Sequence, residues 1–206
     1  MRILEERINE LRDREGQIRV MILGLGSVGN YLLNYLMSMQ DERLTFYVVG
    51  RKKLHMTSYV NIARIASQIM VQYRSQFYIE WDVDFNSVDR IAQCLKMCQP
   101  DIIVNSSRAY AGLKYGSISW NKIRAYGIWA PLAVKYTKNI MEAYEQADAH
   151  AIVINTSYSD AVIPWLKSSG RAYPDFGSGN VNHLIPRVQF AVAGWYGIND
   201  YWNIDV

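Results

Sequence analysis

Residues 18–29 read IRVMILGLGSVG, an apolar run that leads directly into three closely spaced glycines. Apolar residues at helical spacing follow, so the stretch predicts a strand, a glycine turn and a helix. At such a turn Gly24 permits a tight bend, Gly26 lets the backbone approach a phosphate and Gly29 lets the helix pack closely on the strand. The helix N-terminus offers free N–H groups and the positive end of its dipole to an anion. The residues expected to hold a dinucleotide pyrophosphate here are Gly24, Gly26, Ser27, Val28 and Gly29.

The overall composition indicates one globular domain. The chain has 206 residues, of which 50% are hydrophobic and 20% are charged, enough for a sizeable core. Its net charge of +3 is too small to indicate the basic stripe of a nucleic-acid-binding protein. No apolar run reaches the ~18 residues of a membrane helix, and the charged N-terminus is unlike a signal peptide. We therefore expect neither a nucleic-acid partner nor attachment to a membrane.

Two compositional features concern compartment and assembly. Cys94 and Cys98 are four residues apart, a spacing that fits neither a zinc site nor a disulfide framework. Reduced thiols and a cytoplasmic location are therefore expected. The chain also has 15 tyrosines and 6 tryptophans, which favours aromatic-rich surfaces such as a subunit interface. A homodimer is one expectation from this content.

Strand and helix patterns alternate along the chain after an amphipathic helix at 2–15. Further strands are expected at 43–50, 77–83, 101–105 and 151–155, and helices at 54–73, from 88 to before 100, at 130–145, 161–166 and 181–193. This repetition implies right-handed parallel crossovers and an open sheet with helices on both faces. The predicted fold is a doubly wound parallel α/β sheet. Residues 1–16 form its N-terminal helix and residues 17–206 its dinucleotide-binding domain.

The carboxyl ends of the expected strands supply the other candidate ligands. Ligands bind beyond these ends, and the end of the second strand meets the adenosine ribose. Arg51 and Lys52 follow that strand with no Asp or Glu, which favours the 2′-phosphate of NADP over the free hydroxyl of NAD. Asp82 is expected near the adenine, and Asn105 and Ser106 near the nicotinamide half. NAD is the alternative cofactor, and a solvated basic loop is the alternative role of the two cations.

Together these features resemble a Rossmann-type NAD(P)-binding domain. The first half resembles that of saccharopine-dehydrogenase-like reductases, and the second half is similar to the lactate and malate dehydrogenase family. The residues that carry the first resemblance are the glycine turn, Gly50, Arg51, Asp82 and the strand DIIVN at 101–105. Those that carry the second are Asn155 and Thr156 at a strand end, and a Gly-Ser-Gly turn at 177–179 that opens a helix.

The resemblance also implies roles for residues near a substrate. Arg108 would polarise a substrate carbonyl, and Asn155 would contact the nicotinamide or the substrate. His183 stands roughly where the dehydrogenase family has the aspartate that orients a catalytic histidine, and Arg187 lies one position from its carboxylate-binding arginine. The candidate catalytic residues are therefore Arg108, Asn155 and His183. The family's catalytic histidine itself has no counterpart in the sequence.

The expected function is that of an NADP(H)-binding oxidoreductase domain, with a substrate domain absent or truncated. It would transfer hydride to or from a carbonyl, imine or hydroxy group of a small-molecule substrate. One alternative is a regulatory or sensing module that binds NADP without turnover. A further alternative is an extended short-chain-type sugar-nucleotide enzyme, which depends on the Tyr-x-x-x-Lys match of Tyr110 and Lys114. No metal site is expected, including at the acidic segment 81–85.

Overall fold

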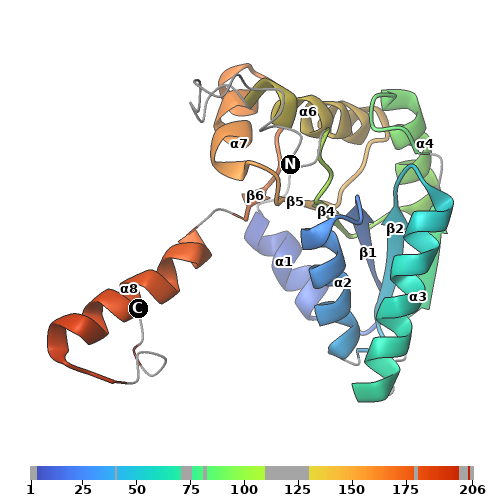
Figure 1. The fold of residues 1–206 in the computed structure, drawn as a ribbon. Coiled ribbons are helices and arrows are strands. Elements are labelled where there is room, and N and C mark those ends of the chain that lie inside the picture. The colour runs from blue at the N-terminus through green and yellow to red at the C-terminus, as the bar shows by residue number, and fades with distance from the viewer. Residues whose placement is uncertain are drawn as a thin grey trace.

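A parallel sheet forms the centre of the molecule (Figure 1). The structure is a computed structural model, and it describes residues 4–39, 41–70, 76–80, 83–109, 130–178, 181–199 and 204. Within them six strands lie in the order β3-β2-β1-β4-β5-β6, and every neighbouring pair is parallel. The strands are β1 (Ile18–Leu23), β2 (Leu44–Val49), β3 (Gln76–Glu80), β4 (Ile102–Asn105), β5 (Ile152–Asn155) and β6 (Phe176–Gly177). This order confirms the predicted doubly wound, Rossmann-type α/β fold.

Helices cover both faces of the sheet, as the sequence predicts. One face carries α2 (Ser27–Ser38) and α3 (Lys53–Met70), and the other carries α4 (Val88–Cys98), α6 (Ala130–Gln146) and α7 (Ser159–Ser168) (Figure 1). The predicted N-terminal helix is α1 (Leu4–Arg12), which lies at the amino edge of the sheet, and α8 (Val181–Tyr196) follows β6. Most predicted boundaries differ from these by a few residues, as is usual for helix and strand ends.

Alternate residues of the central strand enter two separate cores. Val20 and Ile22 of β1 pack against α2 and α3, whereas Met21 and Leu23 pack against the opposite helical layer. All four side chains are buried. Because both faces of the strand are covered, it is apolar at nearly every position and does not alternate between apolar and polar residues.

The strands end level with one another at the edge that carries the glycine turn. Leu23, the last residue of β1, pairs with Val49 of β2 and with Asn105 of β4. Asn105 in turn pairs with Asn155, the last residue of β5. Segments that follow these strands are therefore neighbours in space although they are far apart in the sequence. This carboxyl edge is where a doubly wound sheet binds its ligands.

Three details differ from the sequence prediction. The sequence does not predict β6, because a strand of two residues has no measurable periodicity. The described part of β3 is Gln76–Glu80, and Val83 lies outside the strand, so the predicted strand at 77–83 extends beyond it. The apolar stripe that predicts α3 also lies on the wrong side for a core: Ile62, Ile65 and Ile69 are exposed. The α3 residues that are buried are Met56, Val60, Ala63 and Ser67.

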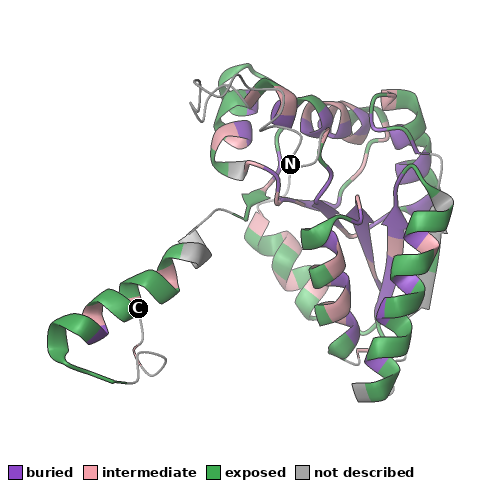
Figure 2. Ribbon diagram, viewed as in Figure 1, coloured by how far each residue is buried: buried purple, intermediate pink, exposed green. Residues whose placement is uncertain are grey.

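The last described helix leads away from the body of the molecule (Figure 1). Most of α8 is exposed (Figure 2), and Ala193 is its only buried residue among those described. Within the described part of the chain, none of the helices combines the length and the apolar character needed to span a bilayer.

Candidate dinucleotide-binding site

A cavity of about 610 Å³ lies at the carboxyl edge of the sheet. Four segments line it: the glycine turn at 24–28, the segment 50–52 after β2, the segment 106–108 after β4, and Thr156 after β5. The sequence predicts this convergence, because the four segments follow neighbouring parallel strands. Ser107 and Thr156, which belong to the predicted strand ends, also line the cavity. His55, Met56 and Phe85 line it as well, although no sequence pattern marked them as site residues.

The first glycine of the turn holds a backbone conformation that favours glycine. Gly24 has a φ of 86°, and its N–H donates to the carbonyl oxygen of Val49 at 2.9 Å. A Cβ at this position would lie 2.8 Å from the Cα of Ser107. Both the positive φ and the lack of space therefore exclude a larger residue. The hydrogen bond to Val49 and the close contact with Ser107 fix the turn between the ends of β2 and β4.

The third glycine brings α2 against the turn. A Cβ on Gly29 would lie 2.4 Å from the carbonyl oxygen of Gly24 and 2.5 Å from the Oγ of Ser106. The Ser106 hydroxyl donates a hydrogen bond to that same Gly24 oxygen. Ser106 is predicted to contact the cofactor, and its hydrogen bond to Gly24 also stabilises the glycine turn that would bind the cofactor.

The N-terminus of α2 opens onto the cavity. The helix begins at Ser27, its N-cap residue Gly26 makes no side-chain capping bond, and the first turn contains no acidic residue. The first N–H groups of a helix have no partner within the helix. A Cβ placed on Gly26 would meet nothing within 4 Å, so the cavity leaves room at this glycine for a group to approach the backbone. A phosphate fits these donors.

Basic side chains surround the rest of the cavity. Arg51, Lys52, His55 and Arg108 line it, and none of its described lining residues is Asp or Glu. The Arg51 guanidinium lies 6.0 Å from the ring centroid of Tyr136, a buried residue of α6. This distance is at the limit of a cation–π interaction. The lining therefore favours an anionic ligand.

One carboxylate lies near this basic cluster but outside the lining. Hydrogen bonds from the backbone N–H and the side chain of Asn86 hold the pKa of Asp84 below its usual value, and the positive charge of Arg51 adds to the effect. Asp84 is therefore ionised at neutral pH, and its carboxylate accepts both of these hydrogen bonds from Asn86. It does not neutralise the cavity wall by an ion pair among the described residues.

Two asparagines predicted to contact ligands lie beneath the cavity. Asn105 and Asn155 are both 0% exposed. The Nδ2 of Asn105 donates to Asn155 Oδ1 at 2.9 Å and to Thr137 Oγ1 at 3.1 Å, and Asn155 donates to the carbonyl oxygen of Ser157 at 2.8 Å. These amides are committed to protein groups. In this structure both amides hold protein groups in place, and their contact with a ligand stays a prediction.

The same pair of asparagines also fixes the segment that follows β4. Asn105 Oδ1 accepts a hydrogen bond from the backbone N–H of Ser107 at 3.1 Å and another from its hydroxyl at 2.6 Å. Ser107 is the residue that packs against Gly24. We call the side chains of Asn105 and Asn155 the asparagine pair. It links α6, β4 and β5 to the glycine turn.

The remaining predicted residues fall into two groups. Arg51, Lys52 and Arg108 are exposed and line the cavity, as predicted for residues that meet a ligand. Asp82, Tyr110 and Lys114 lie outside the described residues, as does the side chain of His183. The helix α8, which carries His183 and Arg187, leads away from the body (Figure 1), and Arg187 does not line the cavity. His55 could have been found from the sequence, because it lies in the first turn of the helix that follows Lys52.

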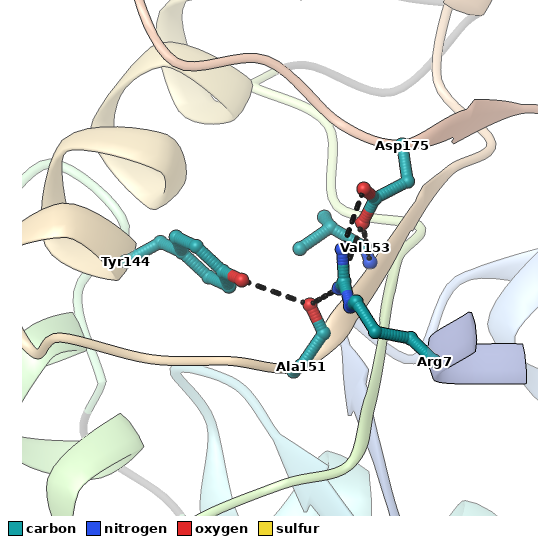
Figure 3. A network of polar contacts seen from close by, with 5 residues as sticks. All are labelled: Arg7, Tyr144, Ala151, Val153 and Asp175. Carbon is teal, nitrogen blue, oxygen red and sulfur yellow. Dashed lines mark hydrogen bonds and ion pairs between the residues drawn. The ribbon is translucent and has the colours of Figure 1, made fainter. Parts of the chain in front are cut away.

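A second cavity, of about 390 Å³, lies at the opposite, amino edge of the sheet between α1, β4 and β5. Figure 3 shows how α1 is fixed beside it. Arg7 pairs with Asp175 at 3.0 Å and also donates to the backbone oxygen of Ala151, while Asp175 accepts from the N–H of Val153 at 2.8 Å. The Tyr144 hydroxyl donates to Ala151 as well, at 3.0 Å. Burial raises the pKa of Tyr144.

A second arginine of this region is paired in the same way. Arg14 lies 2.6 Å from Asp101 and 3.6 Å from Glu10. Asp101 also accepts a hydrogen bond from the N–H of Arg19 at the start of β1. The amino edge thus contains charges that neutralise one another, and its polar contacts attach α1 to the sheet.

Comparison with known proteins identifies the fold. No protein-family model matches the sequence, and no curated protein is similar to it in sequence. Among solved structures, the lactate dehydrogenase of Cryptosporidium parvum complexed with lactic acid and nicotinamide adenine dinucleotide matches 90% of this chain, with a TM-score of 0.56 and 13% identity. The lactate dehydrogenase of Eimeria maxima with NADH and oxamate matches 88%, with a TM-score of 0.52 and 12% identity.

These two matches extend over 52% and 49% of the dehydrogenases, so this chain spans about half of their length. At such low identity the likeness concerns the fold alone. The chain therefore has a Rossmann-type fold that is also found in lactate dehydrogenases.

Proposed function

We propose that the chain binds NADP(H) at the carboxyl edge of its sheet and belongs to an oxidoreductase. The observation that carries this proposal is the cavity itself, in which the glycine turn and the N-terminus of α2 face Arg51, Lys52 and Arg108 without a lining carboxylate among the described residues. The likeness to dehydrogenases whose structures hold NAD or NADH supports a nicotinamide dinucleotide at the level of the fold. Arg51 favours the 2′-phosphate, because its planar guanidinium can bind a phosphate through two hydrogen bonds.

Each part of the cavity has its own task in this proposal. The N–H groups at Ser27 and Val28 would bind the pyrophosphate, and Arg51 with Lys52 the phosphate on the ribose. When bound, the cofactor would supply or accept the hydride. Arg108, after β4, would polarise a carbonyl, imine or hydroxy group of a small-molecule substrate. Asp82 stays proposed for the adenine, and Asn105 and Ser106 for the nicotinamide half. Asn155 stays proposed for the nicotinamide or the substrate, and His183 for the substrate.

A binding and turnover experiment tests the proposal. The intact chain is titrated with NADPH and with NADH, and NADPH oxidation is then followed against a panel of aldehydes, ketones and imines. We expect tighter binding of NADPH than of NADH, and turnover with at least one compound. The absence of NADPH binding would exclude the proposed cofactor, and tight binding without any turnover would exclude the hydride-transfer reaction.

A sensing module that binds NADP without turnover is the second candidate. It is favoured by the position of α8, the helix that contains His183 and Arg187, because α8 leads away from the body of the molecule. The burial of the Asn155 amide favours it as well. Of the candidate catalytic residues whose side chains are described, Arg108 lines the cavity and Asn155 does not. The turnover panel separates the two candidates directly.

Two further expectations belong to the proposal. A cytoplasmic location is supported by Cys94 and Cys98, which are both buried in α4 and form no disulfide. A homodimer is supported by aromatic side chains that remain exposed on helices, among them Tyr31 and Trp195.

A further inference from the structure

Two neighbouring helices carry apolar side chains on the side that points away from the sheet. On α2 the most exposed are Tyr31, at 76%, and Tyr35. On α3 they are Leu54, Ile62, Ile65 and Ile69, of which Leu54 is 82% exposed. We call these six residues the α2–α3 face. Monomeric proteins rarely expose a continuous apolar patch larger than a few hundred Å², so a face of this kind indicates an interaction site.

The helix α8 has the same property among its described side chains, from Leu184 to Tyr196. Leu184, Val188 and Trp195 follow one another at spacings of four and seven and are exposed along one side, with Trp195 at 85%, and Tyr196 is exposed as well. A helix that is apolar around most of its circumference is normally buried in a folded assembly. Figure 2 shows that most of the described part of α8 is exposed.

We infer that these two surfaces form one interface between two copies of the chain. In a two-fold symmetric dimer, α8 of each copy lies along the α2–α3 face of the other. Within one copy the surfaces are at opposite sides of the molecule: α8 leaves from β6 at one edge of the sheet, whereas α3 connects β2 and β3 at the other. In a dimer, α8 of one copy can contact the α2–α3 face of the other without any change in the fold of either chain.

The dimensions of the two surfaces agree. At 1.5 Å per residue, the 16 residues of α8 and the 18 residues of α3 are each about 25 Å long. Aromatic side chains such as Tyr31, Tyr35, Trp195 and Tyr196 bury about 150–250 Å² each when they are fully covered. Two reciprocal contacts would therefore bury roughly 2,000 Å² in total, which reaches the size of stable protein–protein interfaces. The tyrosines and Trp195 are residue types that anchor such interfaces.

The low number of charged residues on α2, α3 and α8 is compatible with burial of these surfaces in a dimer. The exposed faces of α2 and α3 carry few charges among these apolar residues, and α8 has Arg187 as its only charged residue apart from His183. Burial of the interface therefore does not require many ions to lose their hydration. The inference does not depend on which dinucleotide the cavity binds.

Sedimentation equilibrium of the full chain tests the dimer with two matched variants. The face variant is Ile62→Glu with Ile65→Glu, and the helix variant is Leu184→Glu with Trp195→Glu. All four positions are exposed, so we expect both variants to keep the circular dichroism spectrum of the parent. Each variant should raise the dissociation constant of the dimer at least ~30-fold, because each loses residues that anchor the interface. Met97→Glu, at an exposed position on the opposite helical layer, should leave it unchanged.

Mixing the variants identifies the reciprocal contact. A mixed dimer combines the intact α8 of the face variant with the intact α2–α3 face of the helix variant, so one contact survives. We expect a one-to-one mixture to associate more tightly than either variant alone. A parent chain that stays monomeric, including one that binds phospholipid vesicles instead, would overturn the inference. So would a helix variant that dimerises like the parent, or a mixture that gains no association.

Discussion

The two edges of the sheet use their charged residues in opposite ways. At the amino edge Arg7 is paired with Asp175 and Arg14 with Asp101, and these pairs hold α1 in place. At the carboxyl edge Arg51, Lys52 and Arg108 face a larger cavity that has no carboxylate among its described lining residues. Cations that are neutralised within the protein stabilise it, whereas cations that are left facing a cavity attract an anion. The charged residues of the amino edge therefore stabilise the fold, and those of the carboxyl edge are available to bind a ligand.

The largest effect is expected from Gly29→Ala at the carboxyl edge. The added Cβ would meet the backbone oxygen of Gly24 at 2.4 Å, and backbone cannot move aside as a flexible side chain can. We expect a loss of about 2–3 kcal/mol of unfolding free energy and a weakening of NADPH binding by at least ~100-fold. Urea denaturation and calorimetric titration measure the two effects.

Gly194→Ala in α8 is the matched control, because a Cβ there would meet nothing within 4 Å. It should bind NADPH like the parent. A Gly29→Ala variant with parental affinity would show that the turn does not position the ligand.

The asparagine pair should show the next largest effect. Asn105→Ala removes one donor to Asn155 Oδ1 and the acceptor of the N–H and hydroxyl of Ser107, at a cost of about 2 kcal/mol in unfolding free energy. Because the two amides share a hydrogen bond, Asn105→Ala and Asn155→Ala together should cost less than the sum of the single changes. A double-mutant cycle in urea measures this coupling. Strictly additive losses would mean that the two side chains act independently.

The Arg7 network at the amino edge should affect stability alone. Arg7→Ala removes the charged partner of Asp175 and a donor to Ala151, and we expect a loss of about 2 kcal/mol in unfolding free energy. The dissociation constant for NADPH should stay within about twofold of the parent, because the network lies at the far end of the strands. Asp175→Asn, which keeps the shape of the side chain, is the matched variant. A tenfold loss of NADPH affinity in either variant would contradict the division between the edges.

The smallest effect is a pH dependence near the amino edge. Hydrogen bonds from Arg43 hold the pKa of Asp41 below its ordinary 3.8. This carboxylate therefore stabilises the fold above pH 3.8, and the contribution is lost as the pH falls through the lower pKa of the folded state. Asp41→Asn should be slightly less stable than the parent at pH 7 and equally stable at the acid end. Thermal melts between pH 2.5 and 7 measure the difference, and a constant gap over this range would contradict the assignment.

The sequence predicts the framework of the site well, for a physical reason. Repeated crossovers place the ends of successive parallel strands at one edge, so Gly24, Arg51 and Arg108 are brought together by topology alone. The glycines report backbone geometry directly, as the φ of Gly24 shows. Side-chain direction is harder to predict. Asn105 and Asn155 lie at the predicted edge, yet their amides turn toward each other and away from the cavity.

The sequence also predicts poorly which side of a helix faces the core when the helix has more apolar residues than one core can bury. The spacing of Ile62, Ile65 and Ile69 correctly predicts a helix, but the buried side of α3 contains smaller residues such as Ala63. A period of 3.6 residues identifies a stripe and does not say whether the sheet or another subunit covers it. His183 shows the same limit, since its place depends on the direction taken by α8 and not on its local sequence.

The most direct test of the binding edge is a pair of calorimetric titrations of the Arg51→Ala variant, with NADPH and with NADH. The loss of one charge-assisted contact to the 2′-phosphate should raise the dissociation constant for NADPH roughly 10- to 100-fold. The constant for NADH, which lacks this phosphate, should change by less than about threefold. Arg90→Ala, an exposed arginine of α4 away from the cavity, should change neither. Equal losses for the two cofactors, or no loss for either, would contradict the assignment of Arg51 to the 2′-phosphate.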